Sequence, residues 1–381
     1  MIRFFRCVNC GLEYPVNINH LRCECGAPFE LVHDCVFLKS EVDKEVRSIW
    51  RYRKAIPVEK DGSIVTLGEG FTPILPLSYK GYNIWVKLEY VSPTGSFKDR
   101  GASVLFSFLR EIGVKNIVED SSGNAGVSVS AYGARAGIEC EIFCPEYTSG
   151  GKLIQISLYG AKLVKVKGSR EDTSKAAVKA AQTKYYASHN WHPFFIEGLK
   201  TLSFEIVEQL NWNVPDNIVL PLGFGGLYYS LYLGFKQLLR DGIVCKIPRL
   251  FGVQSEMCCP LYEAFVTNGG VNPEYVQRGE TIAEGICGAK PVFWKQIIGA
   301  VRETGGSIVT VSDREIEESL KVLLRQGFLV EPTSAVVIKG MEKFVEIRAI
   351  KSSEKTLLIL TGSGLKTLDR LEEIFYKRHG L

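Results

Sequence analysis

The sequence predicts an α/β fold with two doubly wound parallel-sheet lobes, preceded by a small cysteine-rich unit. Three observations predict it: four cysteines in the first 25 residues, β-rich runs that alternate with alanine-rich helical segments from about residue 84, and a second alternation after residue 190. Such alternation is the βαβ pattern of a parallel sheet. Because ligands of these folds bind near the carboxyl ends of the strands, we expect a ligand site between the lobes.

Length and composition are those of a globular protein with two or three structural units. The chain has 381 residues, of which 46% are apolar and 23% charged. A net charge of +4 argues against nucleic acid or an anionic membrane as the main partner, and leaves a small anionic ligand open. The first six residues contain no apolar signal-peptide core. The uncharged stretch 217–235 is broken by Pro221 and several glycines, and we interpret it as strand, loop and buried helix start, not as a membrane span.

Residues 1–35 carry two cysteine pairs, Cys7 with Cys10 and Cys23 with Cys25, each followed by a glycine suited to a tight turn. This pattern predicts a zinc-ribbon-like unit in which the four thiolates bind a structural zinc ion, because four protein ligands leave no open position for catalysis. The second pair encloses one residue instead of two, so His20 is an alternative ligand. A small β unit with buried free cysteines is the other interpretation. The remaining cysteines are scattered, which favours a reducing cytoplasm over a disulfide framework.

The rest of the chain is divided by its secondary-structure pattern. We expect residues 36–91 to form a linker and the start of the large lobe, with a charged, helix-permissive stretch at 40–46. Residues 92–188 are expected to form the small α/β lobe, and residues 189–381 the large one. The expected strands are 116–119, 140–143 and 162–166 in the small lobe, and 218–221, 249–253, 307–311 and 356–360 in the large lobe. Helices are expected at 126–136 and 174–184.

The segment 92–101 is a turn that leads into a helix. Ser96 is a candidate N-cap, and Lys98 lies in the first turn of a helix that continues to Arg110. The positive end of a helix disfavours the ammonium form of Lys98, and a neutral amine can form an imine. Taken alone, such a lysine is more often a solvated surface residue.

Three loops that follow expected strands offer polar groups. The first opens a helix of small residues, so its backbone N–H groups can bind a carboxylate, and it consists of Ser121, Ser122, Gly123 and Asn124. The second can bring bare amides against a phosphate, although it lacks the full dinucleotide fingerprint, and it consists of Gly223, Phe224, Gly225, Gly226 and Leu227. The third begins at Thr361 and offers a hydroxyl. An ordinary strand-to-helix turn is the alternative interpretation for each loop.

Four motifs in this order resemble those of threonine synthases. They are Pro93–Gly101 (PTGSFKDRG), Ser122–Asn124 (SGN), Glu197–Thr201 (EGLKT) and Thr361–Lys366 (TGSGLK). Threonine synthases belong to the fold-type II enzymes that use pyridoxal phosphate (PLP), a family related to the tryptophan synthase beta chains. The resemblance spans about residues 67–370, and the cysteine-rich start is similar too.

The resemblance implies a PLP fold-type II architecture and a role for each motif. Lys98 is expected to hold PLP as a Schiff base, Asn124 to contact the ring hydroxyl, the 223–227 loop to bind the cofactor phosphate, and Thr361 to contact the pyridine nitrogen. A neutral hydroxyl does not keep this nitrogen protonated as a carboxylate would, which favours eliminations and replacements over transamination. The substrate is then an amino acid, bound by Ser96 and residues 121–123, and family analogy implies a homodimer.

One position departs from the family pattern. Threonine synthases commonly carry an arginine two residues before the glutamate of the EGxKT stretch, where this chain has Phe195. The candidate replacements for its charge are His189, His192, Lys152 and Lys200, each with a structural role as the alternative. The 223–227 loop and the segment 282–286 look more like those of serine and threonine dehydratases.

We therefore expect a lyase that converts O-phosphohomoserine and water to threonine and phosphate. A PLP-dependent serine or threonine ammonia-lyase, or another enzyme acting on an O-phospho amino acid, is the first alternative. A non-catalytic zinc-ribbon adaptor on an inactive enzyme fold is the second. An intact Lys98 and Asn124 argue against that last alternative.

Overall fold

The computed structural model describes residues 1–20, 22–148, 150–273, 276, 279–288 and 290–377. The chain forms two compact units, each built from two stretches of sequence. Unit 1 comprises Met1–Phe71 and Ser92–Thr201, and unit 2 comprises Thr72–Val91 and Leu202–Leu381. Each unit contains a sheet of mainly parallel strands, which confirms the predicted fold class.

Unit 1 begins with a three-stranded antiparallel sheet in the order β2-β1-β3. Its strands are β1 (Arg3–Cys7), β2 (Glu13–Pro15) and β3 (Phe29–His33). The Phe5 and Phe29 rings stack at 5.8 Å between centroids and are buried, so this small sheet has an aromatic core. The stretch 40–46, which the sequence predicted to be helix-permissive, is not an α-helix. Only a 3₁₀ turn at Lys39–Glu41 touches it, and a longer 3₁₀ segment follows at Ile49–Ala55.

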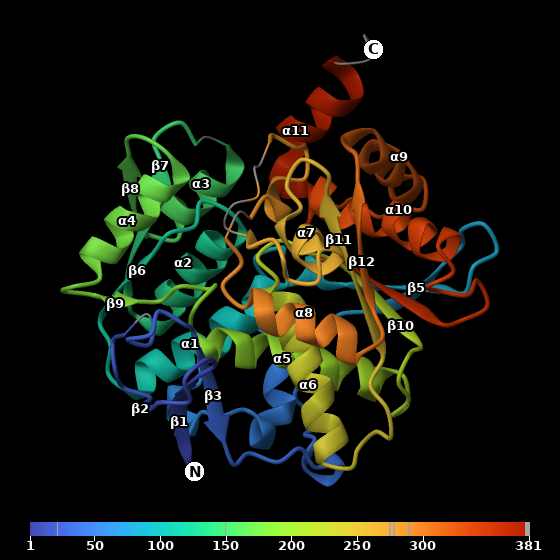
Figure 1. Cartoon of the computed structure of the whole chain (residues 1–381). Coiled ribbons are helices and arrows are strands. Elements are labelled where there is room, and N and C mark those ends of the chain that lie inside the picture. Colours follow the sequence, from blue (N-terminus) through green and yellow to red (C-terminus); the bar gives the residue numbers. More distant parts are fainter. Residues whose placement is uncertain (21, 149, 274–275, 277–278, 289, 378–381) are drawn as a thin grey trace. The chain divides into compact units, whose positions relative to one another are not determined.

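The main sheet of unit 1 has four parallel strands in the order β8-β7-β6-β9. These strands are β6 (Asn116–Glu119), β7 (Glu139–Pro145), β8 (Lys162–Val166) and β9 (Tyr185–Tyr186). Successive side chains point to opposite faces. Ile117 packs with residues of helices α1 and α2, whereas Val118 packs against Ala177 of α4. Helices therefore cover both faces, as Figure 1 shows around β6.

The helices of unit 1 begin where local capping permits. They are α1 (Lys98–Glu111), α2 (Asn124–Ala136), α3 (Gly151–Leu158), α4 (Arg170–Ala180) and the first half of α5 (Pro193–Gln209). Helix α4 starts four residues before the predicted position because Ser169 and Asp172 form a capping box, in which each side chain bonds the other's backbone N–H.

Unit 2 contains a six-stranded sheet in the order β12-β11-β10-β13-β5-β4, in which only the edge strand β4 is antiparallel. Its strands are β4 (Ile74–Leu77), β5 (Ile84–Leu88), β10 (Asn217–Pro221), β11 (Arg249–Ser255), β12 (Ser307–Val311) and β13 (Thr356–Leu360). The other helices are α6 (Gly226–Arg240), α7 (Pro260–Val266), α8 (Trp294–Glu303), α9 (Asp313–Leu324), α10 (Pro332–Glu346) and α11 (Leu368–Glu372). Figure 1 shows α9 and α10 on one side of this sheet and α6 and α8 on the other.

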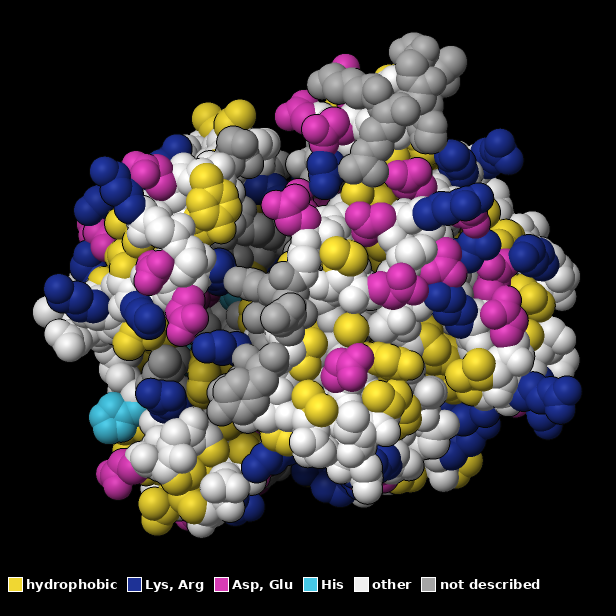
Figure 2. Space-filling view, turned by 45° about the horizontal axis from the view of Figure 1, so that its top comes forward, with side chains coloured by type: hydrophobic (Ala, Val, Ile, Leu, Met, Phe, Trp, Pro, Cys, Tyr) yellow, Lys and Arg dark blue, Asp and Glu magenta, His cyan; other side chains and the backbone are white. Residues whose placement is uncertain are grey.

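The stretch 217–235 forms β10, a loop and the start of α6, as its glycines and Pro221 predicted. Among the residues described, no helix combines the length and the apolar character needed to cross a membrane. Basic and acidic side chains are interspersed over the face shown in Figure 2, in keeping with the small net charge.

Candidate active site

Lys98 is the first residue of α1, directly after a turn that is held by a buried aspartate. Asp99 accepts hydrogen bonds from the Thr94 backbone N–H at 2.7 Å, the Thr94 hydroxyl at 2.6 Å and the Ser128 hydroxyl at 2.7 Å. Ser128 lies one turn into α2, so these bonds join the start of α1 to the helix that Asn124 opens. The prediction that Ser96 caps α1 is wrong. The position before Lys98 is Phe97, without a side-chain cap, because Asp99 already binds the turn.

The surroundings of Lys98 favour its neutral amine. The side chain is partly buried, and its Nζ lies 4.8 Å from the centroid of the Phe97 ring and 5.8 Å from that of Phe195. Burial lowers the pKa of Lys98 to about 8, against the opposing charge of Glu119. The buried Ser96 hydroxyl, two residues earlier, has no hydrogen-bond partner in the described part of the chain. A nucleophilic amine and a free hydroxyl thus flank the start of α1.

The loop Ser121–Gly123 leads from β6 into α2. The Ser121 hydroxyl accepts a hydrogen bond from the Gly123 backbone N–H at 3.3 Å, and Asn124 is the first helical residue. Gly126 is required here, because an added Cβ would overlap the Ser121 carbonyl group. The loop therefore turns closely over the helix N-terminus, whose backbone N–H groups favour an anionic ligand.

Glu119 and His189 form a buried pair at the end of β6. Strand β9 runs parallel to β6, so the chain after β9 passes the carboxyl end of β6. Glu119 accepts a hydrogen bond from the His189 backbone N–H at 3.0 Å, and its other oxygen lies 2.7 Å from His189 Nδ1. Burial raises the pKa of Glu119 to about 7. Burial, aided by the charge of Lys98, holds the pKa of His189 well below its usual value, so the imidazole is neutral.

Phe195 is a fully buried wall beside Lys98 and His189. Its ring meets the His189 ring edge to face, with centroids 6.0 Å apart. An added Cβ at Gly101 of α1 would overlap the Phe195 ring, and one at Gly198 of α5 would overlap the Arg100 carbonyl oxygen. Helices α1 and α5 therefore cross at two glycines, which places an apolar ring close to the amine of Lys98.

Lys200 contacts the N-terminal sheet. Its Nζ lies 2.7 Å from a Glu197 oxygen, and the same oxygen lies 3.2 Å from His33 Nε2 of β3. Burial alone would raise the pKa of Glu197, but the charges of Lys200 and His33 lower it to about 2. The structure thus holds the Lys200 ammonium in a buried ion pair.

In unit 2, the loop Gly223–Gly225 leads from β10 into α6. Gly225 has a positive φ of 85°, and a Cβ at Gly223 would lie 3.1 Å from the Gly285 carbonyl oxygen. The segment 282–286 therefore packs against this loop. From Gly223 to Tyr228, no backbone N–H donates a hydrogen bond to another described residue. These amides at a helix N-terminus are available to an anion.

Thr361 follows β13, the strand next to β10, so its hydroxyl lies at the same edge of the sheet as the glycine loop. Its Oγ1 lies 3.0 Å from the Ser334 hydroxyl, which also accepts the Thr361 and Gly362 backbone N–H groups. This bonding holds the buried Thr361 side chain in one orientation.

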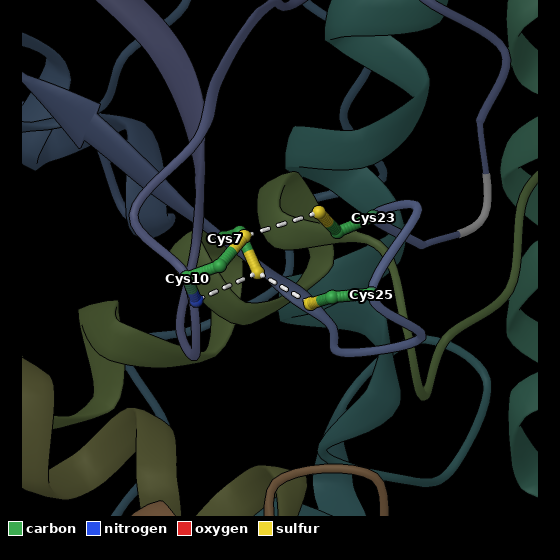
Figure 3. Close-up of side chains that lie close together, drawn as sticks. All are labelled: Cys7, Cys10, Cys23 and Cys25. Carbon is green, nitrogen blue, oxygen red and sulfur yellow. Dashed lines mark hydrogen bonds between the residues drawn. The ribbon is translucent and has the colours of Figure 1, made fainter.

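The four N-terminal cysteines converge from two turns, as Figure 3 shows. The Sγ atoms of Cys7 and Cys25 are 3.4 Å apart, those of Cys10 and Cys23 are 3.5 Å apart, and all four lie within 4.8 Å of one another. His20 is not part of the cluster, although its ring packs on Tyr14.

Sequence reasoning did not identify Glu119 or Asp99 as site residues. A carboxylate at the end of β6 and one directly after Lys98 are the local signals, and such residues are usually exposed. Their roles come from pairing with His189 and Ser128, which lie 70 and 29 residues away along the chain.

Comparisons with known proteins agree with this arrangement. The model of the family described as pyridoxal-phosphate dependent enzymes matches residues 65–362. Threonine synthase of Methanocaldococcus jannaschii is 37% identical, with 96% of this chain and 93% of the relative covered, and that of Methanosarcina acetivorans is 34% identical, with 95% and 91% covered. The resemblance to threonine synthases is confirmed.

Solved structures show the same fold. Threonine deaminase isoform 2 of Solanum lycopersicum has a TM-score of 0.70 at 22% identity, with 91% of this chain and 97% of that chain covered. Maize serine racemase has a TM-score of 0.68 at 22% identity, with 81% and 94% covered. The match over most of the sequence, together with the lysine and the glycine loop, means that the chain belongs to the pyridoxal-phosphate-dependent enzyme family.

Proposed function

We propose that the protein is a lyase that converts O-phosphohomoserine and water to threonine and inorganic phosphate. The observation that carries the proposal is the extent of the match, since relatives named threonine synthase align with 95% or more of this chain at 34–37% identity. Fold alone would not support this substrate, because one fold serves many reactions.

The residues present fit PLP. An aldehyde needs a neutral amine, and the pKa of Lys98 is lowered to about 8. A phosphate needs clustered donors, and the amides after Gly223 are available at the N-terminus of α6. A side chain at Gly223 would fill the space against Gly285. We assign PLP to Lys98, its phosphate to residues 223–227, and its ring contacts to Asn124 and Thr361.

Bound PLP supplies an electron sink for negative charge on the substrate carbons next to the amino group. The chain supplies the rest. Lys98, whose amine gains and loses a proton near neutral pH, moves protons at these carbons. The loop Ser121–Gly123, at the N-terminus of α2, binds the substrate carboxylate, and the free Ser96 hydroxyl donates to a substrate oxygen.

Recognition of the substrate phosphate stays a prediction for His189 and Lys200. Both side chains already bind carboxylates, Glu119 and Glu197 respectively. A phosphate bound near them therefore relies on backbone and hydroxyl donors more than on a guanidinium fork.

The second candidate function is a serine or threonine ammonia-lyase. One observation favours it: Phe195, where threonine synthases commonly carry arginine, is a buried apolar wall next to Lys98. An unphosphorylated substrate would meet such a wall without losing an ion pair.

A product assay separates the two functions. The PLP-loaded protein is incubated with O-phosphohomoserine and, separately, with threonine and serine. The proposal requires equal amounts of threonine and phosphate from O-phosphohomoserine. Formation of a 2-oxo acid and ammonia from threonine or serine, with O-phosphohomoserine left intact, would establish the ammonia-lyase instead.

Three further proposals concern the metal ion, the cellular compartment and the oligomeric state. The cysteine cluster binds one structural zinc ion, because Zn–S bonds of about 2.3 Å in a tetrahedron require sulfur atoms about 3.8 Å apart, close to the spacing seen. None of the eleven cysteines forms a disulfide, which supports a reducing cytoplasm. A homodimer rests on family analogy.

A further inference from the structure

Glu119 and His189 form a carboxylate–imidazole dyad that the motifs do not account for. The carboxylate is fully buried, and both of its oxygens bind His189, one through the backbone N–H and one through Nδ1. Two contacts to one residue fix both the position and the rotation of the imidazole. The dyad therefore presents one ring atom, Nε2, in a defined direction.

The bonding also defines the tautomer of His189. When Glu119 is ionised its oxygens only accept, so Nδ1 of the neutral ring carries the proton and Nε2 keeps its lone pair. In the described part of the chain, no hydrogen bond to His189 Nε2 is present, and the side chain is 7% exposed. An oriented imidazole with an open Nε2 and a carboxylate behind it is an arrangement used for general bases.

The dyad lies beside the proposed chemistry. Lys98 and His189 contact the same Phe195 ring, with the Lys98 Nζ 5.8 Å from its centroid and the His189 ring 6.0 Å from it. The loop that follows Glu119 is the one proposed to bind the substrate carboxylate. The buried Ser96 hydroxyl, which has no hydrogen-bond partner in the described residues, also indicates that a polar ligand binds in this part of unit 1.

The charged groups around His189 indicate whether its imidazole binds a phosphate or accepts a proton. The charged groups that face it are Glu119, Asp120, Lys98 and Arg170, and Arg170 is paired with Asp120 at 3.3 Å. These two carboxylates and two cations balance one another, so the surroundings of the neutral ring provide no net positive charge to hold a dianion. A base acting on a neutral molecule fits this setting, and the only neutral co-reactant of the proposed reaction is water.

We infer that His189, oriented by Glu119, is the base that activates the water added after phosphate has left. This inference rests on the proposed function. The water oxygen bonds to Cβ of the unsaturated substrate, its O–H bond breaks, and its proton passes to His189 Nε2. The electron pair of the double bond moves to Cα, where Lys98 delivers a proton, and the proton on His189 passes to solvent before the next turnover. Glu119 is a positioning residue that also stabilises the charged ring.

The test separates phosphate release from water addition. Glu119→Gln and His189→Asn are compared with the parent enzyme and with Glu303→Gln, a matched control whose carboxylate is exposed and pairs with Lys236. Phosphate, threonine and 2-oxobutyrate formed from O-phosphohomoserine are measured. In both dyad variants, we expect phosphate release within a few fold of the parent, and about a hundredfold less threonine per phosphate, as for loss of a general base. The missing threonine appears as 2-oxobutyrate and ammonia.

Each outcome has one meaning. Unchanged threonine per phosphate in both dyad variants, while the control behaves like the parent, overturns the inference and leaves the proposed function intact. A parent that releases no phosphate and makes no threonine refutes the proposed function, and with it the water-activating role. PLP absorbance and melting temperature of each variant identify any that has failed to fold, and Glu119→Asp is then the substitute.

A readout independent of turnover tests the dyad itself. ¹⁵N NMR of labelled histidines, of which the chain has five, reports the tautomer of each ring. We expect His189 to be neutral with the proton on Nδ1 near neutral pH, and to lose this preference in Glu119→Gln. A proton on Nε2, or a charged ring at neutral pH, would contradict the dyad whatever the activity.

Discussion

The pKa of Lys98 is lowered mainly by burial of its side chain, more than by its position at the start of a helix. The two aromatic rings near its Nζ and the enclosing chain remove water from the ammonium, and this burial lowers its pKa to about 8. Glu119 opposes the shift, because a nearby negative charge favours the ammonium. The balance keeps a usable fraction of neutral amine at physiological pH.

The pKa of Lys98 predicts how the apoprotein captures PLP. The neutral amine is the reactive form, and its fraction rises about tenfold per pH unit below the pKa and levels off above it. The rate of PLP capture, followed by visible absorbance, should therefore rise up to about pH 8 and then become constant. A plateau delayed to the usual lysine pKa of about 10.4 would contradict this burial effect.

Replacing the lysine tests the assignment itself. Lys98→Ala should abolish the visible absorbance of bound PLP and nearly all turnover, because the amine that forms the imine is gone. Lys236, an exposed lysine of unit 2 paired with Glu303, provides a matched control as Lys236→Ala, which should keep both. An unchanged spectrum in Lys98→Ala would refute the cofactor assignment.

Among the elements, the crossing of α1 and α5 controls what lies beside Lys98. The helices approach so closely at Gly101 and Gly198 that neither position has room for a Cβ. The approach brings the Phe195 ring over the first turn of α1. The apolar wall is thus a product of helix packing, and its position depends on two missing side chains.

A pair of glycine substitutions tests this crossing. Gly101→Ala should destabilise the protein by about 1–3 kcal/mol, because overpacking forces Phe195 and α1 apart. Gly299→Ala in α8 is the control, since a Cβ there meets nothing within 4 Å and alanine favours a helix by about 1 kcal/mol. Thermal unfolding of both variants should therefore shift in opposite directions. Equal shifts would mean that the helices are not in backbone contact.

The N-terminal sheet is joined to the same helix by His33, which contacts Glu197 of α5. Cys7→Ser combined with Cys10→Ser should release about one zinc per chain and expose residues 1–35 to hydrogen exchange, because a closed thiolate site holds such a unit together. PLP absorbance should be partly retained. Cys245→Ser, which removes an exposed thiol of unit 2, is the control and should keep the zinc. Metal analysis that finds no zinc in the parent would remove this prediction.

At the scale of the whole molecule, the residues proposed for PLP are distributed over both units of the chain. Lys98 and Asn124 belong to unit 1, whereas Gly223 and Thr361 belong to unit 2. Within unit 1 the Asp99 network orders the start of α1, and within unit 2 Ser334 orders Thr361. Unit 2 also buries the ion pair of Lys87 with Glu205, so its core contains polar groups that a hydropathy pattern would place outside.

The sequence by itself determined the elements whose residues interact locally. β6, β8, β12 and β13 have the predicted bounds, because a short β-branched run between turn residues is a local signal. The motifs and the glycine loop likewise placed Lys98, Asn124, Gly223 and Thr361 at expected element junctions, and their roles toward PLP stay predictions. The cysteine pairs predicted a cluster, which the structure forms without His20.

Only the tertiary structure decided which charges are free and which are paired. His189 and Lys200 have the same appearance in sequence as any candidate cation, yet each binds a buried carboxylate, and for His189 that carboxylate lies 70 residues away. Ser96 has the sequence position of an N-cap, but its hydroxyl does not cap α1. Asp99 instead binds the turn, through hydrogen bonds from Thr94 and Ser128. For His189 and Ser96 the physical reason is contact between segments distant in sequence, and for Lys200 it is the burial of its i,i+3 pair with Glu197 beside His33. Burial and pairing set the pKa values on which the proposed chemistry depends.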